Sequence, residues 1–277
     1  MRFTKMHGIG NDYIYIDATK NVIKNPELLA KKLSDRHYGV GSDGLVLIMP
    51  SVICDFRMRM FNPDGTEAEM CGNASRCVAK YVYDNKMTDK TNFTLETGAG
   101  IKILSIHTNA ENIVDTVTID MGTPILEPEN IPVLASEEKV LNKPLIVLDK
   151  EYKINCVSMG NPHCVIFSEA IGLTDVAHLG PLIENHPMFP KKTNVEFAEI
   201  VDEYNIKMRV WERGTGETLA CGTGACATLV AAVLNGYTTN DVTLHLIGGD
   251  LQIKWNKKTG HVLMTGPAET VFEGEIK

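Results

Sequence analysis

Residues 61–77 read FNPDGTEAEMCGNASRC, and residues 211–227 read WERGTGETLACGTGACA, which is the same arrangement placed 150 positions later. At this offset several patches coincide without a gap: Met58 with Met208, Arg59 with Arg209, Gly10-Asn11 with Gly160-Asn161, Glu67 with Glu217, and Cys71-Gly72 with Cys221-Gly222. Agreement of separate patches at one offset indicates a duplicated unit. Each copy has a Gly-Asn pair, an amphipathic strand, a glycine-rich turn, a Cys-Gly pair and a helix.

The secondary-structure pattern around these copies is mixed. Short alternating runs predict strands in the first half of the chain: DYIYID, LVLIM, DFRMRMF, NFTLET, IKILSIHT and NIVDTVTID. Helices are predicted over residues 26–36, 73–85 and 223–236, the last ending at a glycine. GTPILEPENIPV at 122–133 has three prolines and no periodicity, which predicts a linker and a boundary near residue 120. The sequence therefore predicts an α/β chain of two similar domains.

The composition excludes several classes of protein. The chain has 277 residues, of which 44% are apolar and 22% charged, and it can bury a core without disulfides or structural metals. Its net charge of −8, with no basic stripe, argues against a nucleic-acid partner. No apolar leader is present, and the aliphatic run ATLVAAVL is shorter than the roughly 20 residues of a membrane span. We expect a cytoplasmic protein that binds neither nucleic acid nor membranes.

The chain contains seven cysteines, an odd number with no CxxC motif, which predicts reduced thiols rather than a disulfide framework. Free cysteines usually behave as small buried hydrophobic residues. We assign four of them to the core: Cys54, Cys77, Cys156 and Cys226. Cys71 and Cys221 differ because each directly precedes a predicted helix and is followed by glycine.

The start of a helix has two chemical consequences for a cysteine. The unpaired N–H groups of the first turn suit a carboxylate, and their partial positive charge favours a thiolate, which predicts a pKa lowered from about 8.5. Two such cysteines in equivalent positions predict proton transfer at one carbon from two faces. The alternatives are structural thiols, a dithiol redox pair, or a zinc site made of His163, Cys164, Cys221 and Cys226. The missing CxxC and finger-type spacings disfavour the last two.

The motifs together resemble those of the diaminopimelate epimerases, cofactor-independent enzymes that interconvert LL- and meso-2,6-diaminopimelate. In chain order they are MHGIGNDYIYID at 6–17, GVGSDGL at 39–45, FNPDGTEAEMCGNASRC at 61–77, MGNPHCVIF at 159–167, TNVEF at 193–197 and WERGTGETLACGTGACA at 211–227. The resemblance implies an α/β (α+β) fold of two pseudo-symmetric domains, each a mostly antiparallel sheet wrapped around a central helix. The expected domains are residues 1–120 plus 267–277, and residues 121–266.

The resemblance also implies roles for individual residues. Cys71 and Cys221 match the acid/base pair, and His163 and Glu212 match the residues that adjust the pKa values of the cysteines. The positions that match substrate-binding residues are Asn11, Asn62, Gly72, Asn73, Asn161, Asn194, Glu212, Arg213, Gly222 and Thr223. A zwitterion with two carboxylates needs groups of both signs, and Arg213 can bind the distal carboxylate through two hydrogen bonds.

Three positions depart from the usual pattern of the family. Ala74 replaces a glycine, Gly44 stands where some members have a substrate-binding glutamine, and Pro63 stands where a small residue is common. None removes a catalytic group, but they leave open a related racemase of histidine or lanthionine, or a binding protein for a small zwitterion. We expect an amino-acid substrate, no cofactor such as pyridoxal phosphate and no metal. The resemblance further implies a homodimer.

Overall fold

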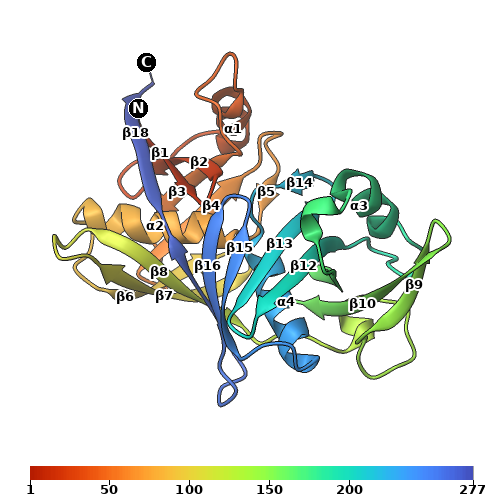
Figure 1. The fold of residues 1–277 in the computed structure, drawn as a ribbon. Coiled ribbons are helices and arrows are strands. Elements are labelled where there is room, and N and C mark those ends of the chain that lie inside the picture. Colours follow the sequence, from red (N-terminus) through yellow and green to blue (C-terminus); the bar gives the residue numbers. More distant parts are fainter. Residues whose placement is uncertain (277) are drawn as a thin grey trace. The chain divides into compact units, whose positions relative to one another are not determined.

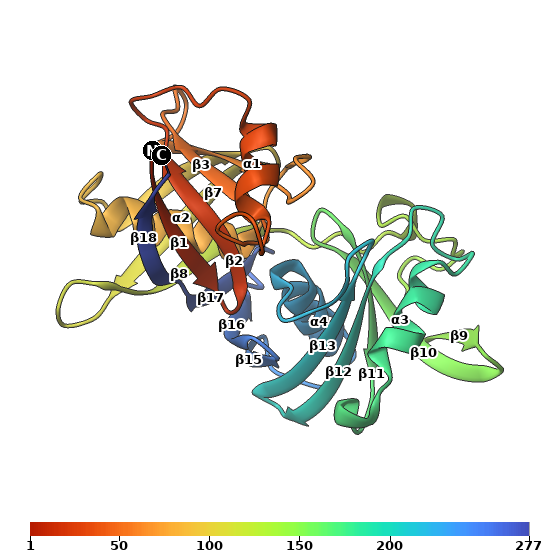
Figure 2. The same cartoon turned by 90° about the horizontal axis from the view of Figure 1, so that it is seen from above.

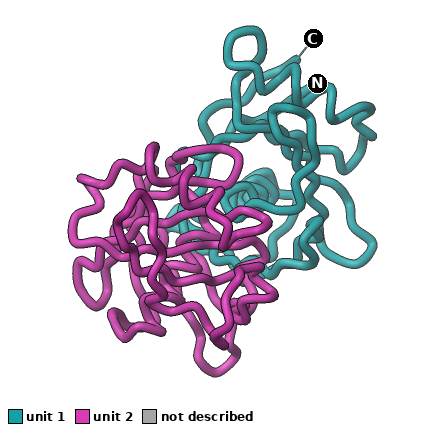
Figure 3. The backbone as a smooth tube through the Cα atoms, turned by 90° about the vertical axis from the view of Figure 1, so that its right-hand side faces the viewer, with its two compact units in different colours: residues 1–120, 265–277 teal, residues 121–264 magenta. Residues whose placement is uncertain are grey.

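The computed structural model describes residues 1–276, and the chain separates into two compact units (Figure 3). Unit 1 comprises Met1–Asp120 together with the chain from Thr265 onward, and unit 2 comprises Met121–Met264. Thr265 and Gly266, which the sequence assigned to the second domain, fall in unit 1 by this division. Among the described residues, no helix combines the length and the apolar composition that crossing a membrane requires.

Unit 1 is a sheet folded around a helix (Figure 1). Its strands are β1 (Arg2–Gly8), β2 (Asn11–Asp17), β3 (Leu45–Met49), β4 (Phe56–Phe61), β5 (Glu67–Ala68), β6 (Asn92–Thr97), β7 (Gly100–Thr108), β8 (Val114–Gly122, ending just inside unit 2) and β18 (Glu269–Glu275). The β2–β3 and β4–β6 pairs are parallel, whereas β1–β2, β3–β4, β6–β7 and β7–β8 are antiparallel. Strand β18 pairs with β1, so the end of the chain lies beside its beginning.

Unit 2 repeats this connectivity (Figure 2). Its strands are β9 (Lys143–Val147), β10 (Lys150–Ser158), β11 (Pro162–Phe167), β12 (Asn194–Asp202), β13 (Asn205–Glu212), β14 (Gly216–Thr218), β15 (Asp241–Leu246), β16 (Gly249–Trp255) and β17 (Val262–Pro267, ending in unit 1). Here β11–β12 and β13–β15 are the parallel pairs, at the same places in the order as β2–β3 and β4–β6. The predicted fold class, two related domains with mostly antiparallel sheets, is confirmed.

The central helices are α2 (Gly72–Asp84) and α4 (Gly222–Leu234), each one residue earlier at its start than predicted. Helix α2 packs against β1, β2 and β7, and α4 packs against β10, β11, β12 and β16. The buried run of α4 is nearly all apolar, as expected for a helix enclosed by its sheet. In α2 the buried Lys80 is paired with Asp84, with Nζ 2.8 Å from Oδ2.

Two shorter helices lie on the outer side of the sheets. Helix α1 (Pro26–Ser34) was predicted, whereas α3 (Val176–Glu184) was not, because Gly180 and Pro181 interrupt its pattern. Packing explains this glycine, since a Cβ at Gly180 would lie 2.4 Å from Cγ of Trp211. Helix α3 begins 150 residues after helix α1, so the sequence repeat could have predicted it. The two short 3-10 helices are η1 (Pro128–Asn130) and η2 (Ile171–Leu173).

The proline-rich stretch at 122–133 follows the division between the two units, and its Ile131 and Val133 are buried in the core of unit 2. One prediction about packing was wrong. Cys77, Cys156 and Cys226 are buried as predicted, but Cys54 is partly exposed. Cys54 lies in the bend before β4, where its backbone N–H donates to Oγ of Ser51 at 3.0 Å.

The buried thiols predict how stability depends on pH. Burial raises the pKa of Cys77 from 9.0 to about 11, and burial raises the pKa of Cys164 as well. A raised folded-state pKa contributes stability below the unfolded value, and this contribution is lost as the pH rises through the folded value. We therefore expect the free energy of unfolding to fall between about pH 9 and pH 11, by up to about 1.4 kcal/mol per pH unit for each thiol.

Urea unfolding at a series of pH values measures this loss. The matched control is Cys77→Ala, which removes one titrating thiol and is expected to make the decline above pH 9 shallower, although it lowers stability at neutral pH. An unfolding free energy that stays constant between about pH 8 and pH 11 would contradict the prediction.

Candidate active site

Two cysteines stand at equivalent helix starts, one in each unit. Cys71 is the N-cap of α2 (φ −139°, ψ 125°) and Cys221 is the N-cap of α4 (φ −126°, ψ 108°). A glycine follows each cysteine as the first helical residue. Each unit therefore presents a thiol next to the backbone N–H groups of a helical first turn, the arrangement that suits a carboxylate.

The Cys71 thiol belongs to a hydrogen-bonded cluster within unit 1. Its Sγ donates to Oδ1 of Asn11 at 3.3 Å, and the same oxygen accepts from Nδ2 of Asn73 at 3.4 Å. Asn73 in turn accepts from Nη2 of the buried Arg76 at 2.9 Å, and Asn11 donates to Asp43 at 3.0 Å. Two of the predicted substrate-binding residues, Asn11 and Asn73, are thus fixed beside the thiol.

The Cys221 thiol belongs to a similar cluster within unit 2. Its Sγ lies 3.5 Å from Oγ1 of Thr223, and Thr223 accepts from Nδ2 of Asn161 at 3.3 Å. Oδ1 of Asn161 lies 3.0 Å from Nε2 of His163, whose ring is fully buried. The cluster therefore joins four of the residues that the sequence singled out in this half of the chain.

Each cluster contains an equivalent side-chain contact at positions that correspond in the repeat. In unit 1 the first residue of β2, Asn11, contacts the second residue of the central helix, Asn73. In unit 2 Asn161 contacts Thr223, and both residues lie 150 positions after their counterparts. The duplicated sequence thus builds the same side-chain contact twice.

The structure adds one acidic residue that was not predicted from the sequence. Glu196 lies on β12 with an exposed fraction of 0%, and its Oε1 is 2.7 Å from Nδ1 of His163. The sequence could have indicated Glu196, because it is an acidic residue between the apolar Val195 and Phe197, and a carboxylate in a buried strand needs a partner.

Carboxylates set the electrostatic surroundings of the second thiol. Burial and the nearby Glu212 and Glu196 raise the pKa of Cys221 well above its ordinary value, whereas hydrogen bonds from Thr223 and from the Gly224 N–H act to lower it. The expectation of a lowered pKa at the helix start is therefore wrong for Cys221, because burial and two carboxylates outweigh the helix. Burial also raises the pKa of Glu212, which accepts from Oγ1 of Thr218 at 2.5 Å.

Asn194 forms a hydrogen bond with the backbone of Arg213 in unit 2. Asn194 is buried, donates to the carbonyl of Pro162 at 2.9 Å and accepts from the backbone N–H of Arg213 at 2.9 Å. The Arg213 side chain is exposed, with Nη1 donating to the carbonyl of Lys191 at 3.0 Å. This arrangement anchors the backbone of Arg213 while its guanidinium lies at the surface.

Asn62 is held by the turn that it begins. Its Nδ2 donates to Oγ1 of Thr66 at 2.9 Å, and its backbone N–H donates to the carbonyl of the same residue. Ala74, one of the three departures from the family pattern, is fully buried in the first turn of α2. The contacts of Asn62 with Thr66 give it a turn-forming role.

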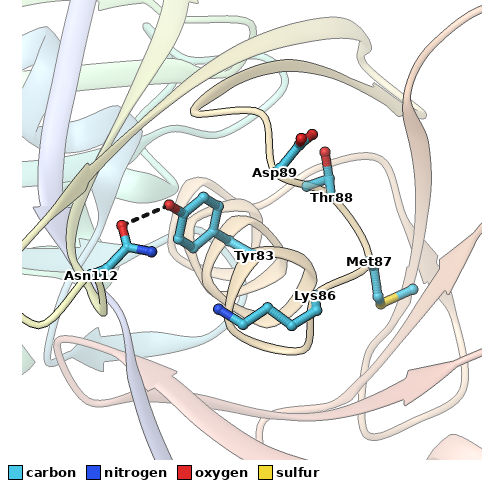
Figure 4. Close-up of a pocket in the computed structure, with 6 residues that line it drawn as sticks. All are labelled: Tyr83, Lys86, Met87, Thr88, Asp89 and Asn112. Carbon is cyan, nitrogen blue, oxygen red and sulfur yellow. Dashed lines mark hydrogen bonds between the residues drawn. The ribbon is translucent and has the colours of Figure 1, made fainter.

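A separate pocket of about 380 Å³ lies at the end of α2 (Figure 4). It is lined by Tyr83, Lys86, Met87, Thr88, Asp89 and Asn112. The Tyr83 hydroxyl donates to Oδ1 of Asn112 at 3.0 Å, which joins the helix to the β7–β8 hairpin. None of these residues was predicted as a site residue. Within residues 1–276, no three His, Cys, Asp or Glu side chains gather as a metal site requires.

The fold defines a class of proteins. A solved structure of a phenazine biosynthesis protein of the PhzF family from Bacillus anthracis matches with a TM-score of 0.73 at 16% identity, covering 100% of this chain and 99% of that one. A hydroxyproline epimerase from Agrobacterium vitis matches with a TM-score of 0.70 at 16% identity, covering 100% of this chain and 90% of that one. The chain therefore has the two-unit fold that these epimerase and PhzF-type structures share.

The sequence comparisons narrow the class to one family. The family model described as diaminopimelate epimerase matches residues 3–127 and 155–271. A curated relative named diaminopimelate epimerase, from Methanococcus maripaludis, is 58% identical over 276 residues, covering 100% of this chain and 99% of that protein. The chain belongs to the diaminopimelate epimerase family.

Proposed function

We propose that the protein interconverts LL- and meso-2,6-diaminopimelate by moving a proton at the α-carbon between two cysteine side chains. One observation carries the proposal: Cys71 and Cys221 cap equivalent helices of two repeated units, and each has an asparagine bridge beside it. A repeated thiol suits a reaction that inverts a centre, because inversion needs one base and one acid of similar strength. Membership of the diaminopimelate epimerase family supports the substrate.

In this mechanism the thiolate of one cysteine removes the α-proton, and the electron pair left on carbon spreads into the adjacent carboxylate. The thiol of the other cysteine then gives its proton to the opposite face, which inverts the centre and leaves the second cysteine as thiolate. The N–H groups at Gly72-Asn73 and Gly222-Thr223 stabilise the charge that grows on the carboxylate. Running the reaction backwards exchanges the two cysteines.

Substrate recognition belongs to the same proposal. Arg213 would bind the distal carboxylate with its exposed guanidinium, and Glu212 would accept from an ammonium group. Asn11, Asn62, Asn161 and Asn194 would supply donors and acceptors without adding charge. His163 and Glu212 would tune the thiols, a role supported by the closeness of Glu212 to Cys221.

The assembly of the protein extends the proposal. Unit 1 and unit 2 would be the N-terminal and C-terminal epimerase domains of a cytoplasmic enzyme that needs no cofactor. We further infer a homodimer, supported by the exposed apolar side chains Val271 and Phe272 on β18, which are 52% and 44% exposed. Exposed apolar side chains on a strand suit a second protein surface.

Solvent deuterium incorporation tests the reaction directly. We expect LL-diaminopimelate incubated with the reduced protein in heavy water to gain deuterium at an α-carbon and to form the meso isomer, as followed by NMR. Lanthionine and histidine assayed in parallel are expected to react more slowly, because histidine lacks the distal carboxylate that Arg213 would bind and lanthionine carries a different chain.

The deuterium experiment distinguishes the proposed epimerase from the alternative functions. A binding protein for a zwitterion would retain diaminopimelate without exchanging its α-proton, and a dithiol oxidoreductase would reduce insulin disulfides. Correctly folded, reduced protein that exchanges no α-proton of diaminopimelate would overturn the proposal.

A further inference from the structure

The pairing of His163 with Glu196 has no counterpart in the other half of the chain. The imidazole contacts a carboxylate oxygen of Glu196 through Nδ1 at 2.7 Å and the side-chain amide oxygen Oδ1 of Asn161 through Nε2 at 3.0 Å. At the 150-residue offset, unit 1 has Tyr13 and Val46 in place of the histidine and the glutamate. The two halves therefore share the cysteine, whereas this buried histidine–glutamate pair occurs on the Cys221 side alone.

The chemistry of the groups assigns donors and acceptors to the hydrogen bonds that lead from this pair. A carboxylate only accepts, so Nδ1 of His163 carries a proton. The amide of Asn161 donates its NH₂ to Thr223, which leaves its oxygen to accept from Nε2 of His163. Both ring nitrogens then donate, as in an imidazolium. The Thr223 hydroxyl, which accepts from Asn161, still has its own proton to donate to Cys221 when that residue is a thiolate.

The carboxylate of Glu196 lies against the first turn of α4. A Cβ at Gly224 would lie 2.6 Å from Oε1 of Glu196, so a larger residue there would displace the carboxylate. Oε2 of Glu196 is buried without a hydrogen-bond partner among the residues that the structure describes. Burying a charged pair usually brings no net stability, so its presence here calls for another role.

We propose that Glu196 is a positioning residue for the second catalytic cysteine: it holds the proton on Nδ1 of His163 and thereby directs the chain His163–Asn161–Thr223 toward Cys221. This inference rests on the proposed function, in which Cys221 alternates between thiol and thiolate. Glu196 touches no reacting atom; besides its charge, which raises the pKa of Cys221 through space, it acts on the thiol through the intervening side chains.

The direct test is Glu196→Gln, which keeps the size of the side chain and removes its charge. We expect the ¹⁵N NMR signals of His163 at about pH 7.5 to show two protonated ring nitrogens in the wild type and one in the variant. The kcat for diaminopimelate is expected to fall about 10- to 100-fold with KM changed less than about twofold, because a proton-transfer step and not binding is affected.

Two further variants separate this role from a structural one. Gly224→Ala keeps the charge but displaces the carboxylate, and it is expected to cause the same loss of a ring proton and the same fall in kcat. The control is Glu199→Gln on the same strand, whose side chain accepts from the backbone of Ile171 at 3.1 Å, and it should leave the His163 signals and kcat unchanged.

The outcomes distinguish this inference from the proposed function. A wild type that exchanges no α-proton refutes the proposed function, whereas the His163 signals still report on Glu196. If the wild type is active and Glu196→Gln keeps both ring protons and its kcat, the inference is wrong. If Glu196→Gln does not fold, the wild-type spectrum decides, because an unprotonated ring nitrogen on His163 there would refute the inference.

Discussion

Replacing Cys71 or Cys221 by serine is expected to lower the rate of diaminopimelate epimerisation by at least about 1,000-fold, because a serine hydroxyl at neutral pH is a far weaker acid and base than a thiol. Serine is close to cysteine in size, so the folds of α2 and α4 should remain. The loss should appear in kcat, as measured by conversion of LL- to meso-diaminopimelate by NMR.

Cys54→Ser provides the matched control for this experiment. Cys54 is a free, partly exposed cysteine of unit 1 that caps no helix, so its replacement is expected to leave turnover unchanged. Circular dichroism and urea unfolding of all three variants show that any loss is chemical. Near-normal turnover in either Cys71→Ser or Cys221→Ser would refute the two-thiol mechanism.

The second large effect is on stability, at Gly44. Substitution by glutamine, the residue of some family members, is expected to lower the free energy of unfolding by about 3 kcal/mol or more. Gly44 has φ +152°, and a Cβ there would lie 2.2 Å from the carbonyl oxygen of Phe61 and 2.8 Å from Cε1 of Tyr13. The packing of this chain, rather than its substrate, thus accounts for the departure at position 44.

Substitutions at two other glycines, measured by urea unfolding, are the controls for Gly44→Gln. Gly100 has φ +89° and no neighbour within 4 Å, so Gly100→Ala tests backbone strain alone and should cost about 1 kcal/mol. Gly172 has open space and no positive φ, so Gly172→Ala should change stability by less than about 0.5 kcal/mol. A Gly44→Gln variant as stable as Gly172→Ala would contradict the prediction, because it would show that the position before β3 accommodates a side chain.

Much of the fold was readable from the 150-residue repeat. Helices α2 and α4 fall within one residue of their predicted starts, because both the glycine-rich turn and the apolar pattern recur in the sequence. Helix α3 was missed since Gly180 and Pro181 lower local helix propensity, and only the packing of Trp211 against the glycine explains its sequence. Local propensity and tertiary packing disagree there, and packing wins.

The candidate site was predicted in part. The sequence indicated Cys71, Cys221, Asn161 and His163, and the structure joins the last three within unit 2. It did not indicate Glu196, because a contact between β11 and β12 is a matter of strand register, with His163 opposite Asn194 in a parallel pair. Nor did it indicate the raised pKa of Cys221, which depends on burial and on the carboxylates of Glu212 and Glu196 brought close from β13 and β12.

The sequence by itself determined the duplication, the family and the residue types that carry the chemistry, because all three are patterns in the order of residues along the chain. The tertiary structure alone decided which side chains meet and how strongly each is buried. Burial and neighbouring charge act through space, so the sign of the shift at Cys221 and the partner of His163 appear only once strands β11, β12 and β13 are paired.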